Sequence, residues 1–577
     1  MAKSRNNFTT IEVARGDRQA DLVLRGGKIF STSTREWIET DLAIASGVIV
    51  GWGRRAAKEV VDVSGCYLTP GFIDSHMHLE STKLWVDNFV ATVLPHGTTA
   101  VAADPHEVAN VLGVDGVEAL IEASIPLPFT FGVCASSCVP ASRFESSGAE
   151  LSAHDIAGLL KHDQVLGVAE MMNYPGVIGG DDDVLAKIAV AGNKRVDGHS
   201  PGVSGLSLDA YLCAGIESDH ECTTYEEALE KRRKGMWIFL REGSAAKNIA
   251  KLSRLVREFG TDHCALCTDD REPRLLLEKG HINDCIRVAV KNGITMEDAI
   301  VMATSNAAEY HGFSNLGTLS PGYQADVLVF RSLEGLKPYL VYQKGRLVAQ
   351  DGKLLPDIVK VVPAPAGMRN TIHLKQKLSK NDLVLSPQPG DDSVVRVIEV
   401  HEGSIGTTER LLPYKELETH LINRLAVVER HKKTGRIGRA FALGFGLHAG
   451  AIASTVAHDA HNLMVVGGLS ESDAKDMEVA CNYLASRGGG QVVVYRSEIL
   501  AFTPLPIAGL MSDGSASEVA KEMAQAQQAA RTLGSLLEEP FMILSFIGLS
   551  VIPELRLTDQ GLVDVRLFKL VEPVLHP

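Results

Sequence analysis

The chain has 577 residues, of which 57 are Lys or Arg and 71 are Asp or Glu, so its formal net charge is −14. This acidic balance excludes nucleic acids and anionic membrane surfaces as partners, because both require a basic face on the protein. Hydrophobic residues make up 45% and charged residues 22% of the chain, as in a soluble, well-packed protein. Its length predicts two or three domains, and we expect a small-molecule partner and assembly into a homo-oligomer.

No segment of the sequence predicts secretion or insertion into a membrane. Residues 1–15 are polar and lack an apolar signal core, and the longest apolar run, 541–553, is too short to span a bilayer. We interpret that run as a pair of buried strands. The nine cysteines are scattered, which suits reduced thiols in a cytoplasmic protein. Cys264 and Cys267, the closest pair, lie in an apolar run and are expected to pack in a buried strand.

Short apolar runs between glycine-rich turns occupy residues 21–65 and return within 325–352. Runs of this kind indicate strands, so one small sheet is predicted to form from both flanks of a long middle segment. The composition changes again after residue 367. We therefore divide the chain into three parts: a small β-sandwich domain (1–70 and 311–367), a middle domain (71–310) and a C-terminal α+β domain (368–577).

The middle domain alternates short apolar strands with helical stretches, which is typical of repeated βα units around a parallel sheet. Each predicted strand finishes in polar, reactive residues. There are eight such segments: 72–78, 98–104, 129–134, 165–170, 195–199, 215–220, 236–242 and 263–270. Eight units predict a (β/α)₈ barrel, in which catalytic residues lie at the carboxyl ends of the strands. A helix capped by Thr295 is expected after the eighth strand.

The C-terminal part, 368–577, mixes both kinds of element. Residues 394–400 and 491–495 read as strands. A helix is predicted to begin after Ser470, because apolar residues recur there at helical spacing behind a capping serine.

His76 and His78 end the first predicted strand of the middle domain. Alternate residues of a strand share a face, so both imidazoles can reach one metal ion. This pattern alone is weak, but four more polar residues join it at later strand ends: Glu170, His199, His220 and Asp269. Buried charges of this kind are costly unless they are compensated, and coordination of a metal compensates them. The sequence therefore predicts a metal centre at the barrel mouth.

Residues 70–78 (PGFIDSHMH) resemble the opening metal motif of the amidohydrolase superfamily. Along nearly its whole length the chain is similar to the bacterial adenine deaminases of that superfamily. The segments that carry this resemblance are 78–82, 104–107, 137–140, 169–176, 218–221, 241–244, 268–271 and, in the C-terminal part, 450–462. The resemblance implies hydrolytic deamination of adenine to hypoxanthine and ammonia, as in purine salvage.

The resemblance also implies a binuclear centre. Many relatives bridge two metals with a modified lysine at the fourth strand, but this strand end offers Glu170 and no lysine. A carboxylate has two oxygens and can bridge without modification. Mixed nitrogen and oxygen ligation suits zinc, manganese or iron. The family resemblance favours manganese or iron among these metals. Two divalent ions would lower the pKa of a bridging water and so generate hydroxide.

Asp269 is predicted to take the proton from the attacking hydroxide and pass it to departing ammonia. Asp270 is its rival, but on a regular strand it would face the opposite way, so we favour Asp269. Glu80 or Glu107 is expected to protonate a ring nitrogen of the base.

Recognition of the base is assigned to Glu107, Ser137, Asn173 and Arg241, which lie at or just past strand ends. Glu80, Asp104 and His106 have similar positions. Except for Asn173, each of these residues is equally suited to holding a ligand histidine in place. His458, Asp459 and His461 resemble a small metal or acid–base cluster, and the sequence leaves open whether they are functional or structural.

Three other interpretations of the sequence compete with this one. Another amidohydrolase, acting on a cyclic amide or a different aminopurine, is the nearest, although enzymes for cyclic amides usually keep the bridging lysine. A zinc deaminase of the H-x-E…P-C-x-x-C type matches at His78 and Glu80, but its second half fails, because Cys264-x-x-Cys267 follows histidine instead of proline and lies far downstream. A non-catalytic scaffold is disfavoured because all six predicted ligands are present.

Overall fold

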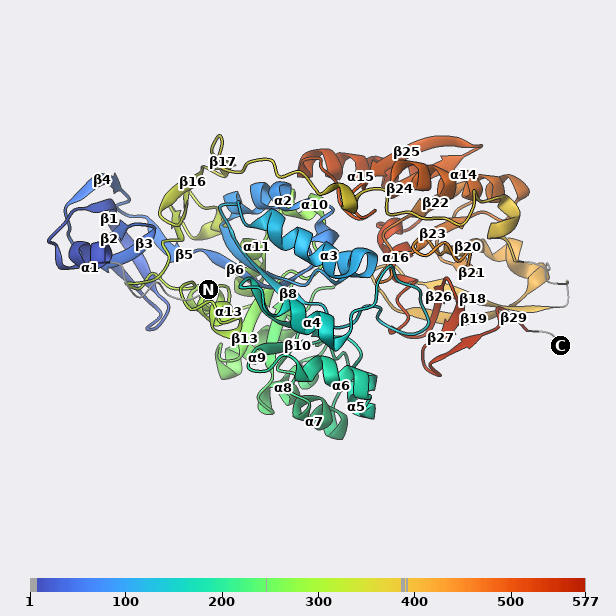
Figure 1. Cartoon of the computed structure of the whole chain (residues 1–577), viewed down its shortest axis with the longest axis horizontal. Coiled ribbons are helices and arrows are strands. Elements are labelled where there is room, and N and C mark those ends of the chain that lie inside the picture. The colour runs from blue at the N-terminus through green and yellow to red at the C-terminus, as the bar shows by residue number, and fades with distance from the viewer. Residues whose placement is uncertain (1–7, 245, 386–389, 391–392, 576–577) are drawn as a thin grey trace.

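The computed structural model describes residues 8–385 apart from 245, residue 390, and residues 393–575. Figure 1 shows the first strands at one end of the molecule, the C-terminal strands and helices at the other, and a middle part between them. Within those described residues, no helix has the length and apolar character needed to cross a lipid bilayer.

The two flanks of the middle part share one sheet. Strand β5 (Tyr67–Pro70) pairs antiparallel with β14 (Val327–Phe330), which joins the early strands to the late ones in a nine-stranded sheet. The prediction of one sheet built from both flanks is therefore confirmed. Helix α1 (Phe8–Arg15) precedes it. The remaining strands are β1 (Ala20–Ser31), β2 (Glu36–Ala45), β3 (Val48–Trp52), β4 (Ala57–Asp62), β15 (Leu340–Gln343), β16 (Arg346–Gln350) and β17 (Lys353–Leu354).

All eight strands predicted for the middle part are present and parallel. The first five form one sheet in the order β10-β9-β8-β7-β6, and the last three form another in the order β11-β12-β13. Their bounds are β6 (Phe72–Met77), β7 (Thr98–Ala103), β8 (Thr130–Ala135), β9 (Val165–Met171), β10 (Arg195–Gly198), β11 (Ser218–Asp219), β12 (Trp237–Arg241) and β13 (Cys264–Cys267). Cys264 and Cys267 are buried free thiols in β13, as expected.

The two parallel sheets meet on both sides. On one side the Glu217 amide donates to the Val196 carbonyl at 3.0 Å, and on the other the Asp269 amide donates to the His76 carbonyl at 2.9 Å. Met77 and Asp269 form an isolated parallel bridge at the second junction. The carboxyl ends of the first and last strands therefore lie beside each other, which brings their polar side chains together.

Helices follow every strand of the middle part and cover the two sheets, since parallel sheets are stable only when both faces are buried. They are α2 (Val86–Val93), α3 (His106–Ser124), α4 (Ala153–Leu159), α5 (Tyr174–Gly179), α6 (Asp182–Ala189), α7 (Gly205–Cys213), α8 (Tyr225–Arg233), α9 (Ile249–Phe259), α10 (Pro273–Glu278), α11 (Ile282–Lys291), α12 (Met296–Met302) and α13 (Ser305–Tyr310). Thr295 caps α12 by accepting from the Asp298 amide, as predicted.

The C-terminal part contains a second nine-stranded sheet. The predicted helix is α14 (Glu471–Arg487), with a capping box between Ser470 and Asp473. Helix α15 (Ala516–Thr532) packs on β25 of the same sheet. The strands are β18 (Val394–Val400), β19 (Thr407–Pro413), β20 (Asn423–Val428), β21 (Ile437–Leu443), β22 (Ala451–Ser454), β23 (Leu463–Gly467), β24 (Gly490–Tyr495), β25 (Glu498–Pro504) and β29 (Val574–Leu575). A separate antiparallel sheet contains β26 (Leu555–Thr558), β27 (Gly561–Asp564) and β28 (Lys569–Val571).

The prediction of two buried strands within 541–553 is wrong. Helix α16 (Pro540–Phe546) occupies the start of this run, and turns and bends follow it. A short continuous apolar run does not distinguish a strand from a buried helix, because both of its faces are apolar. Pro540 is the better guide, since the first turn of a helix tolerates proline and a central strand does not.

Candidate active site

Glu170, at the end of β9, lies at the centre of the cluster that the sequence predicted. Its Oε1 is 3.4 Å from His78 Nε2 and 4.0 Å from His76 Nε2. Its Oε2 is 2.8 Å from His199 Nδ1 and 3.2 Å from His220 Nε2. The carboxylate thus presents one oxygen to each of two pairs of imidazoles.

The orientation of His78 suits a metal ligand. Its Nδ1 lies 2.9 Å from the Asp104 carbonyl oxygen, which only accepts, so the neutral ring carries its proton on Nδ1. The Nε2 lone pair then faces Glu170 and, at 3.0 Å, Asp269 Oδ1. Histidine ligands commonly hold their second nitrogen in this way.

Two further nitrogens point to a bound cation. His76 Nε2 and His106 Nδ1 are buried and have no hydrogen-bond partner among the described residues. Unpartnered polar atoms of this kind are rare in a folded interior. Their positions match groupings that can hold an ion: His76 with Glu170 and His220, His76 with His78 and Asp269, and His78 with Asp104, His106 and Glu170. The donor set of imidazole nitrogens and carboxylate oxygens fits divalent transition metals.

The charges in the cluster favour a cation. Burial acts to raise the pKa of Glu170, but His199 and His220 outweigh it, and the pKa lies well below its usual range. Burial acts to lower the pKa of His199, but Glu221 and Glu170 outweigh it and raise the pKa to about 9. The carboxylates therefore stabilise positive charge at this point, and protons and metal ions compete for it.

Asp269, just after β13, faces both the histidines and an arginine. Its Oδ1 is 3.6 Å from His76 Nε2, while Arg241 Nη1 donates to its other oxygen and to Glu221. Burial acts to raise the pKa of Asp269, but Arg241 and the histidines outweigh it and hold the pKa well below its usual range. Asp269 is thus held as a carboxylate in contact with the histidine cluster.

Asp270 also faces the pocket, although a regular strand would turn it away. Asp269 has a φ of 56°, and this left-handed residue breaks the alternation of side chains after β13. The Ser81 hydroxyl lies between Asp270 and Glu107 and contacts both carboxylates. One hydroxyl proton cannot serve two acceptors, so the arrangement calls for a further proton on one carboxylate. Burial and Asp269 raise the pKa of Asp270.

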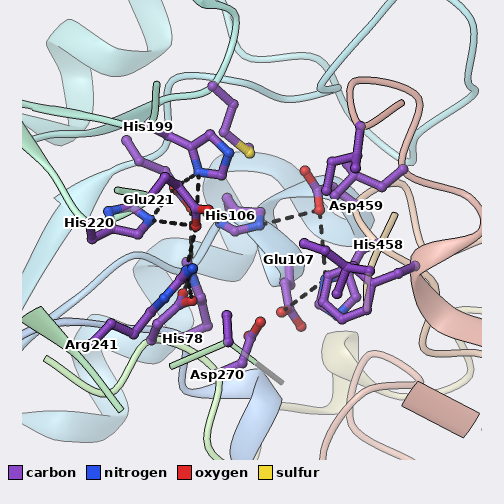
Figure 2. A pocket seen from close by; sticks show the side chains of 18 residues that line it. His78, His106, Glu107, His199, His220, Glu221, Arg241, Asp270, His458 and Asp459 are labelled. Carbon is purple, nitrogen blue, oxygen red and sulfur yellow. Dashed lines mark hydrogen bonds and ion pairs between the residues drawn. The ribbon is translucent and has the colours of Figure 1, made fainter. Parts of the chain in front are cut away.

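The opposite wall of the pocket includes residues of the C-terminal part. Figure 2 shows His199, His220 and Glu221 on one side and Glu107, His458 and Asp459 on the other. The apolar side chains of the lining are Met172, Ala246, Ile405, Phe546, Leu549 and Ile552. The Phe546 ring stacks on His458, with ring centroids 4.4 Å apart. The pocket therefore has the histidine–carboxylate cluster on one side and Glu107, His458 and Asp459 on the other. Ile405, Phe546, Leu549 and Ile552, all from the C-terminal part, form an apolar surface that we call the roof.

Comparison with known proteins then finds two families along the chain. Residues 67–348 match the amidohydrolase family, and residues 409–569 match the adenine deaminase C-terminal domain. The chain is 42% identical to adenine deaminase 2 of Carboxydothermus hydrogenoformans, over 97% of this chain and 98% of that protein. It is 44% identical to an adenine deaminase of Desulfatibacillum aliphaticivorans, over the same shares. The chain belongs to the adenine deaminase family. The resemblance noted in the sequence is confirmed.

In this adenine deaminase family member, the structure brings together all six predicted metal ligands. Two predicted base-binding residues lie elsewhere. Ser137 donates to the Glu170 carbonyl at 2.6 Å, and Asn173 caps α5 by accepting from the Gly176 amide. Both face a different groove, so neither lines the pocket beside the histidines.

Glu80 and Arg241 also differ from expectation. Glu80 accepts from the Val108 amide at 2.8 Å and supports the start of α3 from outside the pocket lining. Burial and Glu107 raise its pKa to about 7. Arg241 does line the pocket, but its guanidinium is engaged by Asp269 and Glu221.

The sequence indicated His106 only as a contact to the base or a support for a ligand histidine, and it gave Glu221 no role of its own. His106 Nδ1 lies 3.7 Å from Glu170 Oε1, and Glu221 Oε1 lies 3.5 Å from His220 Nε2. The positions of both residues in the sequence could have indicated these contacts. His106 follows the second strand by three residues, and Glu221 follows the predicted ligand His220 directly.

Proposed function

We propose that this protein hydrolyses adenine to hypoxanthine and ammonia. The observation that carries the proposal is the pocket itself, in which a histidine–carboxylate cluster faces a polar side wall under an apolar roof. A purine has polar edges and flat apolar faces, and such a pocket complements both. Membership of the adenine deaminase family supports the same substrate.

The cluster is proposed to hold two divalent metal ions. His76 and His78 face one oxygen of Glu170 and also Asp269 Oδ1, whereas His199 and His220 face the other oxygen of Glu170. This arrangement supports Glu170 as the bridging ligand. Bound there, divalent ions supply Lewis acidity and make water acidic enough to react near neutral pH. Manganese or iron is proposed, with zinc as the alternative.

Asp269 is proposed to accept the proton of the attacking water and to return it to departing ammonia. Arg241 keeps that carboxylate ionised and fixed. Asp270, Ser81 and Glu107 hold a proton between them on the neighbouring wall. From there Glu107 is positioned to protonate a ring nitrogen, which makes the adjacent ring carbon more electrophilic.

The apolar roof is proposed to select the free base. Ile405, Phe546 and Ile552 line the pocket. A ribose attached to the base would meet these side chains, so adenosine should be a poor substrate.

The surrounding architecture is proposed to be one closed (β/α)₈ barrel (71–310), flanked by a β-sandwich domain (1–70 and 311–367) and a C-terminal domain (368–577). The hydrogen bonds at both junctions of the parallel sheets support closure. Assembly into a homo-oligomer is also proposed, and size-exclusion chromatography with light scattering tests it.

Ammonia release tests the activity. Protein stripped with a chelator and reloaded with Mn²⁺ is incubated with adenine, adenosine, guanine, cytosine and dihydroorotate. Ring opening of dihydroorotate releases no ammonia, so its turnover is followed by chromatography. We expect robust release from adenine alone, together with hypoxanthine in equal amount. Turnover of adenosine or of the cyclic amide with adenine untouched would overturn the assignment.

A further inference from the structure

The loop between β22 and β23 reaches from the C-terminal part onto the first turn of α3. His461 and Glu107, which meet there, are both fully buried. His461 Nε2 faces Glu107 Oε2 at 3.7 Å, and His458 Nδ1 faces Glu107 Oε1 at 3.5 Å. Within the described part of the chain, neither His461 Nε2 nor Glu107 Oε2 has any hydrogen-bond partner.

The spacing of Glu107, His458 and His461 would admit a cation, but the chemistry of His461 argues against one. The Ala457 amide donates to His461 Nδ1 at 3.0 Å, so that nitrogen carries a lone pair. A neutral imidazole then has its proton on Nε2. Ligation through Nε2 would require an imidazole without any proton. The nitrogen that faces Glu107 is therefore a donor.

We propose that His461 is a positioning residue, whose Nε2–H holds the Glu107 carboxylate against the pocket wall. Glu107 lines the pocket and is the proposed proton donor to the base, so the kinetic part of this inference rests on the proposed function. A buried carboxylate oxygen without a donor is costly, and His461 is the donor that faces it. The 3.7 Å contact shortens to a hydrogen bond when substrate is bound, as catalytic contacts often do.

The loop that carries His461 is itself held firmly. Arg430 is fully buried, and its Nε donates to the His461 carbonyl while its Nη2 donates to the Ala508 carbonyl at 3.1 Å. Asn462 donates to the Ser146 carbonyl at 2.8 Å, which ties the loop to the middle part of the chain. These contacts fix the ring of His461 relative to α3.

The tautomer of His461 tests the inference without any turnover. Zinc-loaded protein with ¹⁵N-labelled histidine is studied by NMR, and the His461 signal is identified by its loss in His461→Gln. We expect a neutral ring protonated on Nε2, whose Nε2–H resonance shifts in Glu107→Gln. A ring protonated on Nδ1, or an unchanged resonance in Glu107→Gln, would overturn the proposal.

A double-mutant cycle tests the kinetic consequence. His461→Phe removes the donor, whereas His461→Gln keeps an amide N–H. We expect His461→Phe to lower kcat about as much as Glu107→Gln, the double variant to be no slower than the slower single variant, and His461→Gln to recover most of the activity. Metal content should stay unchanged. Additive losses, or equal losses in both His461 variants, would contradict a positioning role.

His420→Phe, at a half-exposed histidine of the same part of the chain, is the matched control and should leave kcat unchanged. If wild-type protein ignores adenine, the proposed function fails, and the cycle is run on whichever compound of the panel is turned over. If no compound is turned over, the NMR experiment alone decides the role of His461.

Discussion

The two sides of the pocket are supplied by the chain in different ways. The histidine side is built from residues at the ends of parallel strands, with Glu170 between the pairs. The opposite side combines Glu107 and Asp270 with His458 and an apolar roof that lie in the C-terminal part. The contrast suggests a division of labour. In the proposed mechanism the strand ends bind the metal ions, whereas holding the base and its proton requires contact between two parts of the chain.

The largest effect is expected from Glu170→Gln. The neutral amide cannot bridge two cations, so the variant should fold, lose metal and lose about 10⁴-fold or more in kcat. Elemental analysis and circular dichroism measure this, with Glu118→Gln, at a half-exposed residue of α3, as the control. Full metal content with full turnover would contradict the role of Glu170 as the bridging ligand.

Asp269→Asn and Asp270→Asn distinguish the two sides directly. Asp269 contacts the histidines, so its loss should lower kcat by about 10³-fold and weaken metal binding. Asp270 contacts Ser81 across from them, so its loss should cost about 10-fold to 100-fold with metal retained. The reverse order would transfer the proton-accepting role to Asp270.

Metal affinity should depend on pH through the histidine side alone. The pKa of His199 is about 9, because Glu221 and Glu170 outweigh the effect of burial. Below that pH the apo-protein holds a proton that a metal ion must displace. Affinity should therefore weaken as pH falls, by about tenfold per unit for each displaced proton. Competition with a chelating dye between about pH 6.5 and 8.5 measures this.

Glu221→Gln sharpens the same prediction. Loss of that negative charge lowers the pKa of His199, so a smaller fraction of the ring is protonated near neutral pH. The pH dependence of metal affinity should become shallower in this range. Glu107→Gln, on the other side of the pocket, should leave the dependence unchanged. An affinity independent of pH in wild-type protein would contradict the assignment.

The smallest effect is expected at the roof. Arg556 is fully buried and donates to the carbonyl oxygens of Phe546 (2.8 Å), Ile552 (2.6 Å) and Ile405 (2.7 Å), three residues that line the pocket. Arg556→Met leaves these carbonyls without their donor and loosens the roof. We expect KM for adenine to rise several-fold, or about 1 kcal/mol of binding, with kcat and metal content retained.

Arg410→Met, at a largely exposed arginine, is the control for this substitution and should change neither constant. Loss of metal in Arg556→Met with an unchanged KM would contradict the proposal that the roof acts on the base and the strand ends on the metal.

The sequence by itself determined the strands of the middle part and the residues at their ends. Buried parallel strands appear as short apolar runs, and their carboxyl ends meet at one edge, so polar residues there must come together. For this reason the strand pattern alone was enough to predict one cluster at the barrel mouth. Its members are His76, His78, Glu170, His199, His220 and Asp269. The shared sheet of the two flanks followed from the same kind of local pattern.

Only the tertiary structure decided the other side of the pocket. The contact between His461 and Glu107 joins residues 354 positions apart, and no local pattern specifies which loop packs on α3. It also decided that Ser137 and Asn173 face away from the histidines, and that Asp270 faces the pocket because of the left-handed backbone at Asp269. The physical reason is that strand ends are positioned by regular hydrogen bonding, whereas contacts between distant loops depend on how whole domains pack.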